Sequence, residues 1–330
     1  MKKIQLGKSD VSVTPITFGA WAIGGWMWGG ADEKDAIEAL ETSLDLGISS
    51  IDTAPIYGFG KSEELVGKAI RGKRDKVEIL TKYGMKWEGE QGEFYFESVH
   101  NDGYPVKIYK HASRDSVIAE CEDSLRRLNT DYIDLYQIHW PDATTSIDET
   151  MEAVDRLIQQ GKVRAAGVCN YDATLSRKAN ETIRLASVQV PYSMVRRDIE
   201  ENLVPWCREE NVSILAYSPL QRGLLTGKIT PDYEFGEGDN RPDTPYFQPG
   251  NIQKVNAFLE EIQPIADGKN ATLSQLVLAW TIAQPGITVA LAGARNRKQV
   301  EDNAGAMELR LSRKEIEEIT AKLDELELDI

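Results

Sequence analysis

Four titratable side chains stand at the ends of short apolar segments of the sequence. Asp52 ends one such segment, and Tyr57 follows in a loop that Pro55 enforces, because proline has no N–H to extend a sheet. Lys82 and His139 each follow a later apolar segment. The segments concerned are 48–51, 77–81 and 132–138. As strands of one parallel sheet, they would deliver all four side chains to the same rim.

These four residue types form a coherent set for proton transfer. A free phenol has a pKa of about 10, which a neighbouring ammonium lowers. Asp52 would pair with Lys82 so that the buried cation is not left alone. Tyr57 could then give a proton to a carbonyl oxygen, or take one from an alcohol in reverse, while His139 orients that oxygen. The set has no electron pair to reduce a carbonyl, which indicates a separate hydride donor.

Each residue taken alone also has an ordinary explanation. An Asp that begins a loop often caps a turn, and a lone His is often a hydrogen-bonded packing residue. A different chemistry is open as well, because Lys82 could form a Schiff base in an aldolase-like barrel. The convergence of four titratable types on one rim favours the proton-transfer interpretation.

The elements that would position these residues alternate regularly along the chain. Short apolar segments alternate with amphipathic helices in eight strand–helix units, which is typical of a closed (β/α)8 TIM barrel of the α/β class. Residues 1–14 are expected to form a small β-hairpin. No change in composition marks a boundary, so residues 1–330 are predicted to be one domain. The helices are expected at 32–46, 62–70, 113–128, 146–160, 172–184, 198–210, 251–267, 272–283, 297–304 and 312–326.

Two segments fit none of these units. Residues 83–112, rich in aromatic side chains, follow the third strand, and residues 219–250, rich in Gly, Pro and Asp, follow the seventh. Both leave the carboxyl ends of strands, where barrel enzymes carry out their chemistry. Long loops in compact domains are usually functional, so both segments are expected to border the site.

Composition narrows the class of protein. The formal charge of −15 and the isoelectric point near 4.8 argue against a nucleic-acid partner, whose phosphates need a basic surface. Three cysteines without CxxC spacing predict no disulfide framework. The chain has no apolar run long enough to span a membrane, and its three histidines lack the spacing of metal ligands. We therefore expect a cytoplasmic monomer without a metal.

Several motifs recur in order at the strand ends, and through them the chain resembles the aldo-keto reductase family over essentially its whole length. They are 47–54 with Tyr57-Gly58, Thr81-Lys82, 134–142, 167–170, 189–193, 216–220 and 293–296. The segment 223–228 is most similar to the bacterial general-stress and inositol-operon reductases. The resemblance implies a barrel plugged by the amino-terminal hairpin. It also implies NADPH-dependent reduction of aldehydes and ketones, with Asp52, Tyr57, Lys82 and His139 as the catalytic tetrad. It leaves open a cofactor-sensing regulatory protein with slow turnover.

The cofactor site must lie at the barrel rim, because the sequence lacks a dinucleotide-binding fingerprint. Gly58-Phe59-Gly60 follows a strand, but Glu63 stands where that motif needs a glycine. The resemblance implies that Asn170 and Gln189 hold the nicotinamide carboxamide and that Tyr217 stacks on its ring. It places Arg295 at the ribose phosphate, which favours NADPH over NADH. The other residues that it implies for the cofactor are Gly19, Ala20, Trp21, Asp52, Cys169, Ser218, Pro219, Leu220, Gln221, Arg222, Gly223, Lys228, Arg241, Gly293, Gln299 and Asn303.

An aromatic wall is expected around the substrate. Several tryptophans lie in the loop after the first strand, where core packing explains them poorly, and others flank later strands. Such a mouth favours small aldehydes and ketones without choosing among them. The predicted pocket residues are Trp21, Trp26, Trp28, Tyr57, Trp87, His139 and Trp140.

Overall fold

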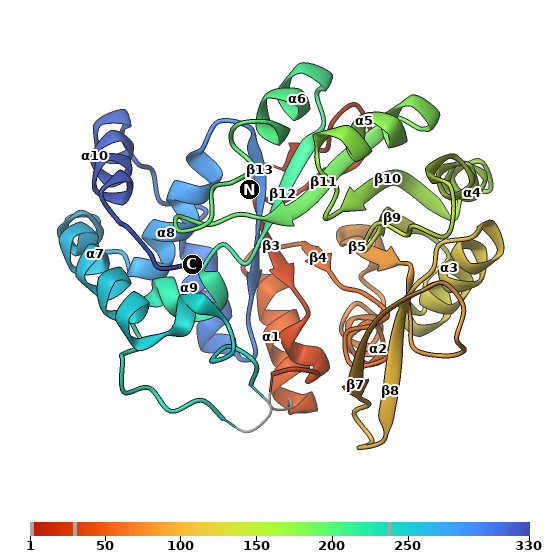
Figure 1. The fold of residues 1–330 in the computed structure, drawn as a ribbon, viewed down its shortest axis with the longest axis horizontal. Coiled ribbons are helices and arrows are strands. Elements are labelled where there is room, and N and C mark those ends of the chain that lie inside the picture. Colours follow the sequence, from red (N-terminus) through yellow and green to blue (C-terminus); the bar gives the residue numbers. More distant parts are fainter. Residues whose placement is uncertain (1–2, 29–31, 237–238) are drawn as a thin grey trace.

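The computed structural model describes residues 3–28, 32–236 and 239–330 and contains a closed barrel of parallel strands (Figure 1). Neighbours in the barrel follow chain order, and the last strand pairs with the first to close it. This confirms the predicted (β/α)8 class. The barrel strands are β3 (Ile16–Gly19), β4 (Ser50–Asp52), β5 (Glu78–Tyr83), β9 (Ile133–Ile138), β10 (Val163–Cys169), β11 (Leu185–Pro191), β12 (Ser213–Tyr217) and β13 (Ile287–Gly293).

A short hairpin closes the amino-terminal end of the barrel. Strands β1 (Ile4–Gln5) and β2 (Ser12–Val13) pair antiparallel, and Leu6 and Val11 pack on the inward-facing Leu80 and Leu135 of the barrel. The backbone N–H of Gly7 donates to Ser213 Oγ at 3.0 Å. Apolar side chains thus fill this end, and the functional groups remain at the opposite one.

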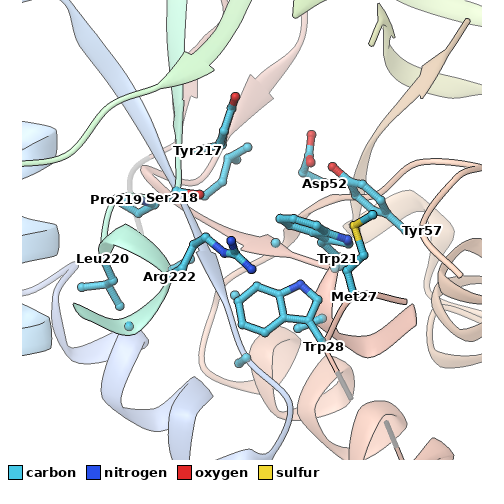
Figure 2. Close-up of a pocket in the computed structure, with 18 of the residues that line it drawn as sticks. Trp21, Met27, Trp28, Asp52, Tyr57, Tyr217, Ser218, Pro219, Leu220 and Arg222 are labelled. Atoms are coloured by element: carbon cyan, nitrogen blue, oxygen red, sulfur yellow. The ribbon is translucent and has the colours of Figure 1, made fainter. Parts of the chain in front are cut away.

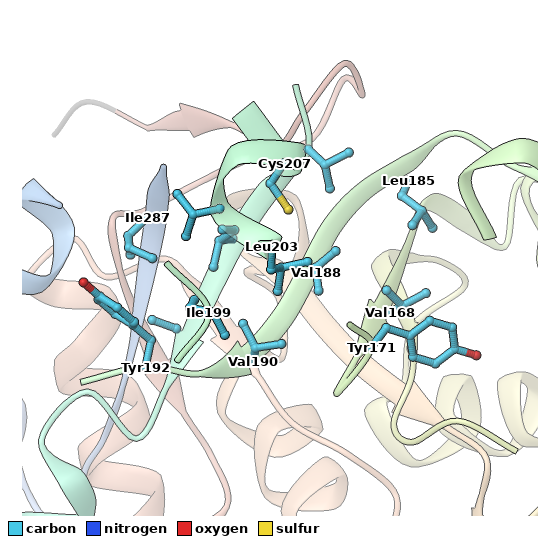
Figure 3. Close-up of a cluster of buried hydrophobic side chains, with 14 of the residues drawn as sticks. Val168, Tyr171, Leu185, Val188, Val190, Tyr192, Ile199, Leu203, Cys207 and Ile287 are labelled. Carbon is cyan, nitrogen blue, oxygen red and sulfur yellow. The ribbon is translucent and has the colours of Figure 1, made fainter. Parts of the chain in front are cut away.

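Helices surround the barrel and bury its outer face. Those that follow the barrel strands are α1 (Glu33–Asp45), α2 (Lys61–Ala69), α3 (Arg114–Leu128), α4 (Ile147–Gln159), α5 (Ala173–Thr182), α6 (Leu203–Glu210), α8 (Leu273–Ala283) and α9 (Arg297–Gly305). Two further helices, α7 (Pro249–Asp267) and α10 (Arg313–Asp324), pack on one another. Figure 3 shows part of the layer between barrel and helices, where Leu203 of α6 lies beside Val188 of β11.

Local side chains fix where the helices begin. Asp32, Ser146 and Asp172 each accept a hydrogen bond from the backbone three residues later, and Thr272 and Ser312 form capping boxes. One expected start is wrong, because residues 198–202 form turns and α6 begins at Leu203. The Glu200 carboxylate accepts hydrogen bonds from Tyr192 and Arg197, which holds this segment against β11 rather than in the helix.

The two long segments differ in structure. Residues 83–112, expected as a loop, contain a three-stranded antiparallel sheet of β6 (Met85–Lys86), β8 (Pro105–Lys110) and β7 (Glu93–Val99). Apart from the first two residues of α7, the described part of 219–250 holds only the short 3₁₀ turns η3 (Gln221–Thr226) and η4 (Pro245–Phe247). Both segments lie on the lower side of the barrel in Figure 1. Among the described residues, no helix is both long and apolar enough to cross a membrane.

Candidate active site

The centre of the site is a buried ion pair at the carboxyl ends of β4 and β5. Lys82 Nζ donates to Asp52 Oδ1 at 2.5 Å and to the carbonyl oxygen of Thr53 at 2.9 Å. Lys82 is 0% exposed and Asp52 is 3% exposed. Neither charge is solvated by bulk water, so each depends on the other. The predicted pairing of these two residues is therefore present.

The phenol and the imidazole stand beside this pair. Lys82 Nζ lies 4.9 Å from the centre of the Tyr57 ring. The His139 ring is 5.7 Å from the Tyr57 ring, at 81° between their planes, and the Trp21 ring stacks on Tyr57 at 6.0 Å. Figure 2 shows the Asp52 carboxylate and the Tyr57 hydroxyl at the same end of the pocket. The four predicted residues are thus brought together.

Burial dominates the titration of these groups. It raises the pKa of Tyr57 to about 12, although the Lys82 ammonium lowers it, and Asp52 adds to the rise. The net direction is opposite to the lowering expected from the sequence, because withdrawal from water outweighs the cation. Burial and the nearby Lys82 hold the pKa of His139 well below its usual value. At neutral pH the site therefore holds a protonated phenol and a neutral imidazole.

Lys82, unlike His139, is held in its charged form. Burial alone would lower its pKa, but Asp52 and then Tyr57 favour the ammonium, and the pKa is raised above its usual value. A Schiff base needs a neutral amine that substrate can reach. Lys82 is charged, completely buried and absent from the cavity lining, so the aldolase alternative is wrong.

Side-chain amides extend the network around Asp52. Its Oδ2 accepts from Gln189 Nε2 at 2.7 Å and from Gln137 Nε2 at 3.4 Å. Tyr217 Oη donates to Asn170 Oδ1 at 2.9 Å, and Asn170 Nδ2 donates to the carbonyl oxygen of His139. Gln137 was not predicted. Its position within an apolar strand two residues before His139 was the available signal.

One cavity of about 490 Å³ connects Asp52, Tyr57 and His139 with most residues implied for the cofactor. Cys169 and Gln221 are the exceptions: the Cys169 side chain is buried, and Gln221 is buried and accepts a hydrogen bond from Ser193. The implied cofactor residues that line the cavity are Gly19, Ala20, Trp21, Asp52, Asn170, Gln189, Tyr217, Ser218, Pro219, Leu220, Arg222, Gly223, Lys228, Arg241, Gly293, Arg295, Gln299 and Asn303.

The part of the cavity near Tyr57 is lined mainly by aromatic side chains. Trp21, Trp26, Trp28 and Trp140 line the cavity as predicted. Trp87 does not, because its ring packs edge-on against Phe59 at 5.6 Å. Sequence reasoning missed the remaining apolar wall, which consists of Met27, Ile56, Met85, Tyr95 and Phe96. The aromatic richness of 83–112 was the signal for two of these.

The cavity is cationic around Trp28. Arg222, Arg241 and Arg295 contact this tryptophan, and Lys228 also lines the cavity. The Arg222 guanidinium lies 5.3 Å from the Trp28 ring, and its buried Nε has no hydrogen-bond partner among the described residues. Burial lowers the pKa of Arg222 to about 10, which leaves it charged at neutral pH. This part of the cavity suits a ligand with anionic groups.

The carboxylate of Glu63 lies outside the cavity. It is completely buried, accepts from Thr81 Oγ1 at 2.6 Å and pairs with Arg127 Nε at 2.7 Å. Glu63 therefore ties α2 to β5 and α3, and the glycines before it do not form a dinucleotide-binding loop. No group of three or more His, Cys, Asp or Glu residues within the described ranges has the arrangement of a metal site.

Comparison with known proteins places the chain among reductases. The model of the aldo/keto reductase family matches residues 15–324. The aldo-keto reductase YhdN of Bacillus subtilis is 39% identical over 91% of this chain and 87% of its own length. The NADH-specific methylglyoxal reductase of Escherichia coli is 38% identical over 94% of this chain and 95% of its own. The structure of glycerol dehydrogenase AKR11B4 from Gluconobacter oxydans is similar with a TM-score of 0.87 at 36% identity, covering 98% of this chain and 95% of that one.

Proposed function

The chain belongs to the aldo/keto reductase family, and on that premise we propose that Tyr57 is the proton donor and NADPH the preferred hydride source of its reaction. At the level of the family, it is an NAD(P)-dependent oxidoreductase that reduces carbonyl groups to alcohols. The observation that carries the proposed roles is the buried Asp52–Lys82 pair beside Tyr57 and His139 at the aromatic part of the cavity.

The residues of the cavity fit a nicotinamide dinucleotide. The unpaired Arg222 Nε and the neighbouring cations suit the phosphates. Gly19 and Gly293 pair at adjacent strand ends and both line the cavity, so no side chain covers the backbone there. The side-chain amide N–H of Gln189 donates to Asp52. The side-chain carbonyl oxygen of Gln189 is therefore free to accept a hydrogen bond from the carboxamide of the nicotinamide. When bound, the cofactor supplies a hydride.

In the proposed reaction, the carbonyl carbon gains the hydride and its oxygen gains a proton from Tyr57 Oη. His139 donates an N–H to the same oxygen and fixes its direction toward the phenol. As the proton leaves, Lys82 stabilises the phenolate by its charge, and Asp52 keeps Lys82 in place. Water then returns a proton to Tyr57. The substrate becomes an alcohol, and every charge formed has a partner.

The two reaction directions should respond differently to pH. Reduction needs the protonated phenol, and with the pKa of Tyr57 at about 12 that form persists throughout pH 6–9. Oxidation needs the phenolate. Below the pKa, the fraction of phenolate rises about tenfold for each unit by which the pH increases. We expect single-turnover reduction to be nearly flat from pH 6 to 9 and alcohol oxidation to rise steeply. A reduction rate that falls with a midpoint near pH 7 would contradict the proposed titration of Tyr57.

The preference for NADPH is supported by one arginine. Arg297 is paired with Glu301 at 2.7 Å, whereas Arg295 lines the cavity and has no carboxylate partner among the described residues. Asp302 also lines the cavity, and its carboxylate accepts from Thr272 Oγ1 at 2.7 Å. The relative from Escherichia coli is named NADH-specific, so membership of the family does not by itself decide between the two cofactors. The proposed preference of this chain depends on a contact between Arg295 and the ribose phosphate that NADPH has and NADH lacks.

The Arg295→Ala variant tests this preference. Loss of one charge-assisted contact of about 1.5–3 kcal/mol should lower kcat/KM with NADPH by about tenfold to a hundredfold and leave NADH nearly unaffected. Arg297→Ala is the matched control, because its guanidinium is already paired with Glu301. Equal kcat/KM values for both cofactors in the unmodified protein would contradict the preference.

The substrate is proposed to be a small uncharged aldehyde or ketone. The walls near Tyr57 offer mainly apolar aromatic surface, while the cations of the cavity gather around Trp28. Single-turnover hydride transfer from NADPH across a panel of aldehydes and sugars tests both the activity and the class. Tight NADPH binding with negligible turnover on the whole panel would instead support the regulatory alternative.

A further inference from the structure

The loop that carries Tyr57 has an unusual backbone. Gly58, Phe59 and Gly60 follow one another with φ values of 68°, 56° and 97°, all in the left-handed region. Phenylalanine rarely adopts such a φ, because its Cβ crowds the backbone. Such conformations persist only where surrounding structure imposes them, and they collect at functional sites. Here the strained residues begin immediately after the proposed proton donor.

The loop after β3 packs backbone to backbone on this strained loop. A Cβ added to Gly58 would lie 2.2 Å from the carbonyl oxygen of Gly24, and one added to Gly24 would lie 2.6 Å from that of Tyr57. Only glycine permits such an approach at either position. The backbone that carries Trp21 and the backbone that carries Tyr57 therefore share one contact.

The hairpin of β7 and β8 reaches across to that contact through its tip. Asn101 Nδ2 donates to the carbonyl oxygens of Gly24 at 3.1 Å and Gly58 at 3.2 Å, so one amide joins both loops. The neighbouring His100 ring lies 4.4 Å from the Phe59 ring. Two adjacent residues at the tip thus hold both the backbone and the side chain of the strained segment.

A second attachment keeps the hairpin itself in place. Trp26 Nε1 donates to Ser98 Oγ at 2.9 Å, and the Trp26 ring stacks on Phe96 at 6.2 Å. Trp26 and Phe96 both line the cavity. The hairpin is therefore fixed to the pocket wall on one side of its tip.

We propose that the hairpin tip, with Asn101 as the principal positioning residue, holds residues 58–60 in their left-handed conformation and thereby places the Tyr57 hydroxyl for proton transfer. The inference rests on the proposed role of Tyr57. Asn101 does not line the cavity and acts through the backbone of Gly24 and Gly58. A displacement of the phenol by about 1 Å is enough to slow a reaction of this kind about a hundredfold.

Two substitutions at Asn101 separate hydrogen bonding from packing. Asn101→Ala removes the amide, and Asn101→Asp keeps its size but sets a carboxylate against two carbonyl oxygens. We expect kcat for aldehyde reduction to fall by about tenfold or more in both variants, with the larger loss in Asn101→Asp. KM for the aldehyde and Kd for NADPH should stay near those of the unmodified protein. Glu97→Ala, an exposed position on β7, is the matched control and should retain full kcat.

Rates must be given per active site, counted by titration with NADPH, and thermal unfolding must be measured for each variant. A role in stability alone would lower the unfolding temperature without changing kcat per site. Unchanged kcat in both Asn101 variants would overturn the inference, as would full activity in Asn101→Asp with a loss only in Asn101→Ala. If the unmodified protein reduced no carbonyl at all, the proposed function would fail instead, and the two failures are thus distinguishable.

Discussion

Tyr57→Phe should lower kcat for carbonyl reduction by about 10²- to 10⁴-fold, the range that a positioned general acid contributes. The substitution removes only the hydroxyl that is proposed to donate the proton. The Lys82–Asp52 bond, the amides around Asp52 and the stacking of Trp21 on the ring do not need that oxygen. Stopped-flow measurement of NADPH oxidation with excess aldehyde gives the rate, and fluorescence titration gives cofactor binding.

The proposed mechanism predicts a particular pattern for this variant. Binding of NADPH should be unchanged while hydride transfer is lost, because the removed interaction acts only as charge develops on the carbonyl oxygen. Tyr233→Phe is a suitable control, since it also removes one phenol from the cavity lining while it keeps the ring. If Tyr57→Phe kept full activity, Tyr57 would not be the proton donor.

Lys82→Met should impair both stability and catalysis. Removing one member of a buried ion pair leaves the other as an uncompensated charge, which costs about 3–5 kcal/mol in the free energy of unfolding. Asp52 would retain its hydrogen bonds from Gln189 and Gln137 but lose its cation. The pKa of Tyr57, already about 12, would rise further without the ammonium, so reduction should also be lost. Urea denaturation of the variant measures the stability.

The double variant Asp52→Asn with Lys82→Met separates the two effects. It removes both charges, so much of the lost free energy of unfolding should return, while carbonyl reduction should stay absent. Equal stability of the single and double variants would show that the Asp52 charge is not the source of the destabilisation.

The sequence determined the barrel because its signals are local. Apolar strands alternating with capped helices needed no tertiary information, and capping residues such as Asp172 and Thr272 stand next to the helices that they begin. The tetrad was predictable for a related reason. The carboxyl ends of all barrel strands meet on one face, so residues that follow different strands converge once the class of fold is known.

What depends on burial or on distant partners was decided only by the tertiary structure. The sign of the Tyr57 pKa shift followed from the extent of its desolvation, which no sequence pattern reports. Trp87 turns to Phe59 rather than to the cavity, and residues 83–112 form a sheet because β8 pairs with both β6 and β7. Asn101 reaches Gly24 and Gly58 across 77 and 43 residues of chain. The sequence therefore determined which groups reach the rim, and packing decided how each is held, since desolvation and close contact exist only between segments that folding brings together.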